Sequence, residues 1–144
     1  MPSVETREVH LTIPVAPEME IAATAQVAAL GEWMEMGRDK IDEVKMAVVE
    51  ACINAFEHSE TPDRRVELDF RIGVADASRV YLEVGVSDAG KGFDPARVSP
   101  PDIADKLKSS RKRGWGIKII ESLMDDVRIE SGTHGTKIVM RKYR

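Results

Sequence analysis

Two neighbouring stretches of strict alternation constrain the fold of this chain most strongly. Residues 66–74 and 79–88 read VELDFRIGV and RVYLEVGVSD, and in each stretch every second residue is apolar. This period of two is typical of strands that bury one face. Because only the short segment ADAS separates them, the two stretches are predicted to pair as an antiparallel hairpin. The apolar residues that alternate are Val66, Leu68, Phe70, Ile72, Val74, Val80, Leu82, Val84 and Val86.

The remaining patterns extend this hairpin into a two-layer fold. Residues 8–15 alternate like a strand, residues 18–36 are rich in helix formers up to a predicted stop at Gly37, and residues 39–58 have a helical period. A long segment without apolar period follows Asp88, and then come a helix from residue 116 and two strands, over residues 127–132 and 135–143. Clustered helices and strands predict an α+β sandwich, with helices on one face of a mixed, mainly antiparallel sheet.

The bulk properties fit one domain over residues 1–144. Hydrophobic residues make up 42% and charged residues 32% of the chain, which is ordinary for a globular protein. A net charge of -4 argues against nucleic acid as a partner. Cys52 is the only cysteine, so no internal disulfide can form. With no apolar run of membrane length and no signal peptide pattern, we expect no membrane contact and a cytoplasmic location.

The second helix carries an unusual polar face. Ile41, Val44, Val48, Cys52 and Ala55 form its predicted core stripe, while Glu43, Glu50, Asn54 and Glu57 fall on the other side. Acidic and amide residues on a helix commonly just face water. Glu50 and Asn54, however, lie one turn apart, so both side chains reach into one small volume. Oxygen ligands of this kind suit a hard cation such as Mg²⁺.

Three glycine-bearing segments add to this face. DAGKGF, residues 88–93, follows a strand, and Asp88 there can accept a hydrogen bond from an exocyclic amine, although a glycine-rich turn alone explains the pattern too. RKRGWG, residues 111–116, precedes a helix whose free N–H groups can bind an anion. HGT, residues 134–136, opens the last strand and is also compatible with a hairpin turn. A P-loop signature is absent from the sequence.

The order of these motifs resembles the GHKL ATPase superfamily, which has the Bergerat nucleotide-binding fold. Glu50 and Asn54 match its N-box, Asp88 to Gly92 its G1 box, Gly114 to Gly116 its G2 box, and Gly135–Thr136 its last motif. The small size and the stretches VVEACINAFEHS and RGWGIKIIESLMDDVRIES resemble the bacterial anti-sigma factor serine/threonine kinases of that superfamily. The resemblance covers nearly the whole chain.

This resemblance implies a role for each matched residue. Glu50 would be the general base or orient the attacking group, and Asn54 would coordinate the Mg²⁺ that bridges the phosphates of ATP. Asp88 would bind the adenine amino group with help from Thr136. Backbone N–H groups at the second glycine pair would hold the phosphates beneath a lid that includes residues 111–113. The implied cofactor-binding residues are Asn54, Asp88, Gly90, Gly92, Arg113, Gly114, Gly116 and Thr136.

The resemblance also implies the partners. Kinases of this family phosphorylate a serine or threonine of a STAS-domain anti-sigma factor antagonist, often sequester a sigma factor, and form homodimers. We therefore expect an ATP- and Mg²⁺-dependent protein serine/threonine kinase that acts in partner switching. Two alternatives stay open: a nucleotide-gated protein-binding module without efficient transfer, and the stand-alone ATPase domain of a two-component kinase.

Overall fold

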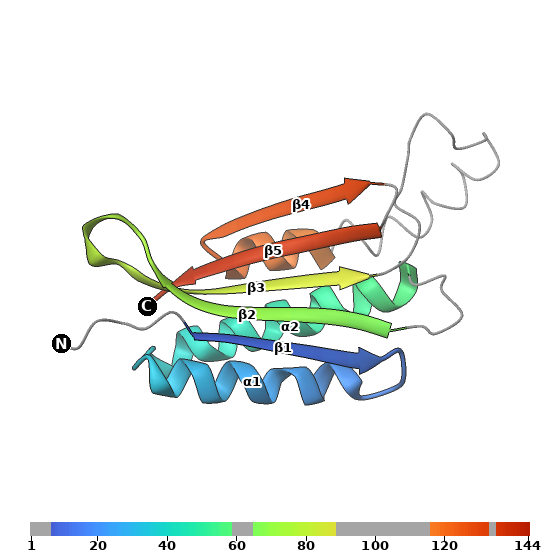
Figure 1. The fold of residues 1–144 in the computed structure, drawn as a ribbon, viewed down its shortest axis with the longest axis horizontal. Helices are drawn as coiled ribbons and strands as arrows, with labels where there is room; N and C mark the ends of the chain where they lie inside the picture. The colour runs from blue at the N-terminus through green and yellow to red at the C-terminus, as the bar shows by residue number, and fades with distance from the viewer. Residues whose placement is uncertain (1–6, 59–64, 89–115, 133–134) are drawn as a thin grey trace.

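The computed structural model describes residues 7–58, 65–88, 116–132 and 135–144 (Figure 1). Residues 116–123 are also helical, and this segment, here called helix 116–123, carries no label in the figure. The other elements are β1 (Arg7–Pro14), α1 (Met19–Trp33), α2 (Arg38–His58), β2 (Arg65–Val74), the short 3₁₀ turn η1 (Asp76–Ser78), β3 (Val80–Asp88), β4 (Asp126–Gly132) and β5 (Gly135–Tyr143). No helix within these ranges combines the length and the apolar character that a membrane crossing requires.

The sheet has five strands in the order β1-β2-β3-β5-β4. Every pairing is antiparallel, and β2 and β3 form the predicted hairpin, with Val66 opposite Asp88 and Val74 opposite Val80. Both α1 and α2 lie against the same face of the sheet (Figure 1). The predicted two-layer α+β fold is confirmed.

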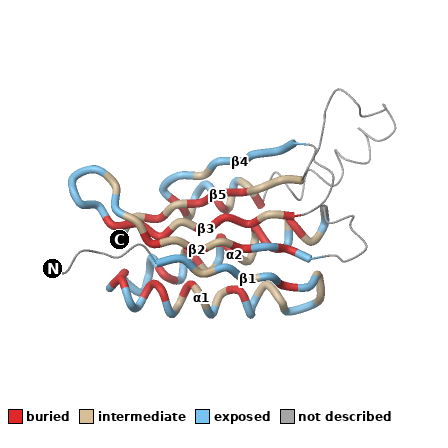
Figure 2. The backbone as a smooth tube through the Cα atoms, in the orientation of Figure 1, coloured by how far each residue is buried: buried red, intermediate tan, exposed pale blue. Residues whose placement is uncertain are grey.

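The core lies between this sheet and its helices. Figure 2 shows the buried positions on the strands and on the helix sides that face them. The apolar residues of the predicted alternation in β2 and β3 are buried, except Val74 at the end of β2. In β3 the other face is largely covered as well, with Tyr81 and Gly85 buried. The predicted stripe of α2 is confirmed as well: Ile41, Val44, Val48, Cys52 and Ala55 are all buried. This packing fixes the rotation of α2 about its axis, and with it the direction of the polar residues opposite the stripe.

The end of α1 differs from the sequence prediction. The helix stops at Trp33, and Glu35, not Gly37, adopts the left-handed conformation that closes it, with φ of 58°. The Met36 N–H donates to Gly31 O at 2.9 Å and the Glu35 N–H to Glu32 O at 3.1 Å. This pair of bonds is a Schellman motif. The prediction was wrong because a glycine usually takes this position, and here glutamate does.

Candidate functional site

The polar side of α2 faces the start of helix 116–123. Glu50 and Asn54 are both partly buried, whereas Glu57, one turn further along, is exposed. A Cβ placed on Gly116 would lie 3.5 Å from Glu50 Oε2. The carboxylate of Glu50 therefore stands directly beside the backbone of the first described residue of that helix. Two of the sequence-predicted motifs, far apart in the chain, are brought together.

Asn54 has an unusual side-chain oxygen. Its Oδ1 atom is buried and has no hydrogen bond partner within the part of the chain that the structure describes. Burying an amide oxygen without a partner costs free energy, so such an atom in a native protein needs an explanation. A hard cation with oxygen ligands supplies one, because a carboxamide oxygen is a suitable ligand for it. Asn54 therefore fits the predicted magnesium ligand.

The described residues offer no cluster of three or more His, Cys, Asp and Glu side chains that could hold a metal ion by themselves. In nucleotide sites Mg²⁺ commonly takes only one or two protein ligands, and phosphate oxygens and waters complete its shell. A single amide oxygen at Asn54 is compatible with that mode of binding.

Asp88 lies at the other side of the predicted site, at the end of β3. It points to the helix-covered face, in phase with Val84 and Val86, and only 6% of its surface is exposed. The Thr136 N–H, at the start of β5, donates to Asp88 Oδ1 at 3.2 Å. The Thr136 Oγ1 atom lies 3.2 Å from Ser131 Oγ on β4. The two residues predicted to recognise adenine are thus neighbours across the β3–β5 pair.

These two groups of residues lie at the same end of the molecule. The C-terminal ends of α2 and β3 and the start of β5 lie at the right-hand end of Figure 1, and the first described residues of helix 116–123 lie at the end of that helix nearer to them. Acidic, amide and backbone N–H groups are therefore available at this end. The other predicted site residues, Gly90, Gly92, Arg113 and Gly114, lie outside the described residues.

Lys142 is not among the residues predicted from the sequence. It is buried on the helix-covered side of β5, where its Nζ atom lies 2.9 Å from Glu43 Oε2 on α2 and 2.5 Å from the Leu123 carbonyl oxygen. The sequence holds a signal for this position, because Lys142 follows Met140 and Ile138 at a spacing of two. A lysine in phase with core residues of a strand indicates a buried cation that needs partners.

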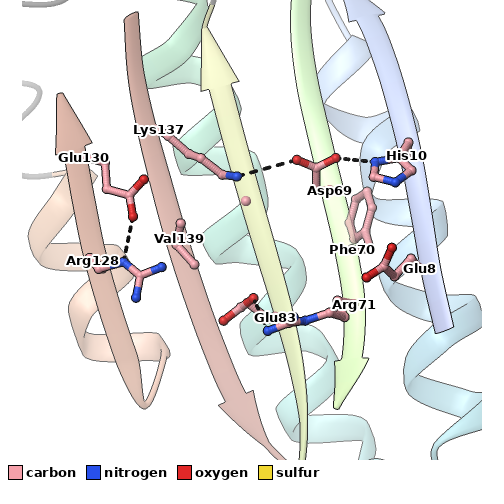
Figure 3. Close-up of a pocket in the computed structure, with 11 residues that line it drawn as sticks. Glu8, His10, Asp69, Phe70, Arg71, Glu83, Arg128, Glu130, Lys137 and Val139 are labelled. Atoms are coloured by element: carbon pink, nitrogen blue, oxygen red, sulfur yellow. Dashed lines mark hydrogen bonds and ion pairs between the residues drawn. The ribbon is translucent and has the colours of Figure 1, made fainter. Parts of the chain in front are cut away.

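A hollow of about 250 Å³ lies on the face of the sheet opposite the helices (Figure 3). Gly85 on β3 and Val139 on β5 contribute to its lining, and charged residues surround them. Most of these charges are paired with one another. The pairs are His10 with Asp69, Lys137 with Asp69 at 3.7 Å, Arg71 with Glu83 at 3.0 Å, and Arg128 with Glu130 at 2.9 Å. The hollow is therefore separated by the sheet from Glu50 and Asn54.

The chain is similar to known proteins over nearly its whole length. Residues 13–142 match the family described as histidine kinase-like ATPase domain. Serine-protein kinase RsbW of Bacillus subtilis (strain 168) is 30% identical over 142 residues, which cover 94% of this chain and 84% of the relative. Serine-protein kinase RsbW of Oceanobacillus iheyensis is 27% identical over 139 residues, covering 94% and 85%.

A solved structure shows the same fold. The RsbU and RsbW domains of Rv1364c from Mycobacterium tuberculosis align with a TM-score of 0.67 at 18% identity, over 96% of this chain and 33% of that one. This structure shows the fold alone. The family is identified by the match over residues 13–142 and by the relative at 30% identity. The chain belongs to the histidine kinase-like ATPase family and, within the GHKL superfamily, to the anti-sigma factor serine kinases.

Proposed function

We propose that this kinase transfers the γ-phosphoryl group of ATP, bound with Mg²⁺, to a serine or threonine of a STAS-domain anti-sigma factor antagonist. The observation that carries the proposal is the position of Glu50. Its carboxylate stands beside Gly116, the first described residue of helix 116–123, one turn of α2 away from the buried Oδ1 of Asn54. A base, a ligand for a hard cation and a helix start for phosphate binding are the parts that phosphoryl transfer requires.

Glu50 would take the proton from the acceptor hydroxyl. As the hydroxyl oxygen forms its bond to the γ-phosphorus, the bond from that phosphorus to the β,γ-bridging oxygen breaks, and ADP leaves with the electron pair. The Glu50 carboxylate holds the proton that the hydroxyl loses. Mg²⁺ at Asn54 would neutralise charge on the phosphates, which is the main contribution that metal ions make to this reaction.

The adenine end of the nucleotide would lie at Asp88. The carboxylate would accept a hydrogen bond from the adenine amino group, and Thr136, whose N–H already donates to Asp88, would assist it. Gly90 and Gly92 would line the same pocket, and Arg113 and Gly114 would bind phosphate together with Gly116. These roles for residues in the segments 89–115 rest on the motif match alone.

The relatives' names support a serine-protein kinase. A regulator of this type would bind a sigma factor in competition with the antagonist, and we expect the kinase to be a homodimer. The two alternatives predict different behaviour. A nucleotide-gated binding module would bind ATP and the antagonist without transferring phosphate, and the ATPase domain of a two-component kinase would phosphorylate a histidine on a separate chain.

The test is radiolabelled phosphate transfer from Mg-ATP to a STAS-domain antagonist, with Glu50→Gln and Glu57→Gln measured in parallel. Glu57 is the matched control, because it is an exposed glutamate on the same helix. We expect transfer by the wild type and by Glu57→Gln, and a loss of about a hundredfold or more in Glu50→Gln. ATP binding together with a stable antagonist complex, but without transfer by the wild type, would support the binding module instead.

A further inference from the structure

Lys142 is a buried cation that joins three elements. Only 7% of its surface is exposed, although lysine is among the residues that proteins bury least. From β5 its ammonium group donates to the Glu43 carboxylate of α2 and to the Leu123 carbonyl at the end of helix 116–123. The Glu43 side chain is 39% exposed, and an ion pair with one partly exposed partner adds little net stability. A lysine at this buried position therefore calls for a role other than stability.

The end of helix 116–123 is held by three consecutive residues of β5. The Asp125 N–H donates to the Arg141 carbonyl at 3.0 Å, and the Tyr143 N–H donates to Asp125 Oδ2 at 2.7 Å. Lys142 lies between them and binds the Leu123 carbonyl. Ile120 and Met124 of the same segment are buried as well. The C-terminal end of the helix is therefore fixed to the sheet.

The opposite end of this helix meets Glu50, and the spacing along the two helices matches. From Glu43 to Glu50 on α2 is seven residues (50 − 43), and from Gly116 to Leu123 is also seven residues (123 − 116). At a rise of about 1.5 Å per residue, both intervals span about 10.5 Å. Helix 116–123 thus runs alongside α2 in the opposite direction, with Gly116 at Glu50 and Leu123 at the Lys142–Glu43 pair.

We propose that Lys142 is a positioning residue for phosphoryl transfer, which locks helix 116–123 at the position along α2 that places Gly116 beside Glu50. The expected effect of Lys142 on the rate of transfer rests on the proposed function. Its expected effect on the position of helix 116–123 does not. Removing the cation takes away the contact that joins the helix to α2 and leaves the contacts of Asp125 with β5, so the helix can shift along α2. A displacement of about 1 Å at the reacting groups is enough to cost about a hundredfold in rate.

The test compares Lys142→Met with Arg141→Met in the full-length protein. Methionine keeps the length and apolar character of the lysine side chain but removes the cation. Arg141 is the matched control, because it is the next residue of β5 and forms an ion pair of 3.0 Å with Glu83 on the opposite face. Both variants lose one ion pair of the same strand, but only Lys142→Met loses the contact with helix 116–123.

Two measurements separate positioning from a general loss of stability. In hydrogen exchange, amides of helix 116–123 should exchange faster in Lys142→Met and at the wild-type rate in Arg141→Met. In phosphate transfer to the antagonist, Lys142→Met should lower kcat by roughly tenfold to a hundredfold and leave the KM for the antagonist unchanged, whereas Arg141→Met keeps the wild-type kcat. Glu43→Gln keeps an acceptor oxygen for Lys142 and should stay near the wild-type rate.

The outcomes distinguish this inference from the proposed function. Unchanged exchange of helix 116–123 in Lys142→Met, or equal effects of the two methionine variants on exchange and kcat, would overturn the positioning role. A wild-type protein that transfers no phosphate would overturn the proposed kinase reaction, and the exchange measurement would still decide whether Lys142 holds the helix.

Discussion

Glu50 and Gly116 lie beside each other on two helices, although 66 residues separate them in the sequence (116 − 50). A Cβ on Gly116 would stand 3.5 Å from Glu50 Oε2, which is an ordinary van der Waals distance. Gly116 also does not have a left-handed φ, because Gly135 is the only glycine with positive φ among the described residues. Neither crowding nor backbone conformation therefore requires glycine at this position in the protein by itself.

This arrangement predicts that Gly116→Ala weakens nucleotide binding and leaves the stability of the fold almost unchanged. The free energy of unfolding should change by less than about 1 kcal/mol, because alanine is well tolerated in helices. The affinity for Mg-ATP should fall by roughly tenfold, about 1.4 kcal/mol, because the methyl group stands between the helix start and a phosphate. Calorimetric titration with Mg-ATP measures this, with Gly37→Ala as control, since a Cβ there meets nothing within 4 Å. Wild-type affinity in Gly116→Ala would contradict phosphate binding at this helix start.

Asn54→Ala should have opposite effects on stability and on binding. The buried Oδ1 has no partner in the described part of the chain, and alanine has the higher helix propensity. We therefore expect the ligand-free variant to gain on the order of 1 kcal/mol in the free energy of unfolding. The increase in melting temperature that Mg-ATP gives the wild type should disappear. Thermal unfolding with and without Mg-ATP measures both, and a variant that Mg-ATP stabilises as much as the wild type would refute the ligand role of Asn54.

The sequence predicted the helices and strands in which apolar residues recur with a regular period. The alternation of Leu68 and Phe70 and the helical period of Val44 and Val48 each specify a buried face, and burial of that face fixes the direction of everything opposite it. Glu50 and Asn54 could be found in this way. Their contact with Gly116 could not, because no local pattern gives the position of one helix along another.

The features that the sequence missed depend on single residues in a three-dimensional setting. Glu35 closes α1 although its side chain disfavours the left-handed conformation, so the more common glycine signal pointed to the wrong residue. Lys142 is neutralised by Glu43, which precedes it by 99 residues. Pairing over such a distance follows from the sheet order, which becomes known only when β5 is seen to lie beside β3.

Asp88→Asn should reduce the preference for adenine. The amide oxygen of asparagine can still accept the hydrogen bond that Thr136 N–H donates to Asp88, so the strand ends should stay paired. Its NH₂ group, however, would face the adenine amino group as a second donor. The ratio of GTP to ATP dissociation constants should fall by roughly tenfold or more. Competition binding of the two nucleotides measures the ratio, with Asp69→Asn on the opposite face as control. An unchanged ratio would rule out adenine recognition by Asp88.

Cys52 should make the stability of this protein depend on alkaline pH. Burial, and to a smaller extent the negative charge of Glu20, raises the pKa of its thiol from 9.0 to about 12. The unfolded chain therefore loses this proton at a lower pH than the folded protein, so the contribution of the protonated thiol is complete below about pH 9 and is lost as pH rises toward 12. Between pH 9 and pH 10 the loss amounts to about 1 kcal/mol.

Urea unfolding of the wild type and of Cys52→Ala at several pH values measures this contribution. Cys52 is fully buried, so the alanine variant is less stable at neutral pH, and the gap between the two proteins should narrow above pH 9. Subtracting the variant removes the effect of tyrosines and lysines, which titrate in both proteins. A gap that stays constant from pH 8 to pH 10 would show that the folded thiol ionises as readily as the unfolded one, and hence that water reaches the interface between α2 and the sheet.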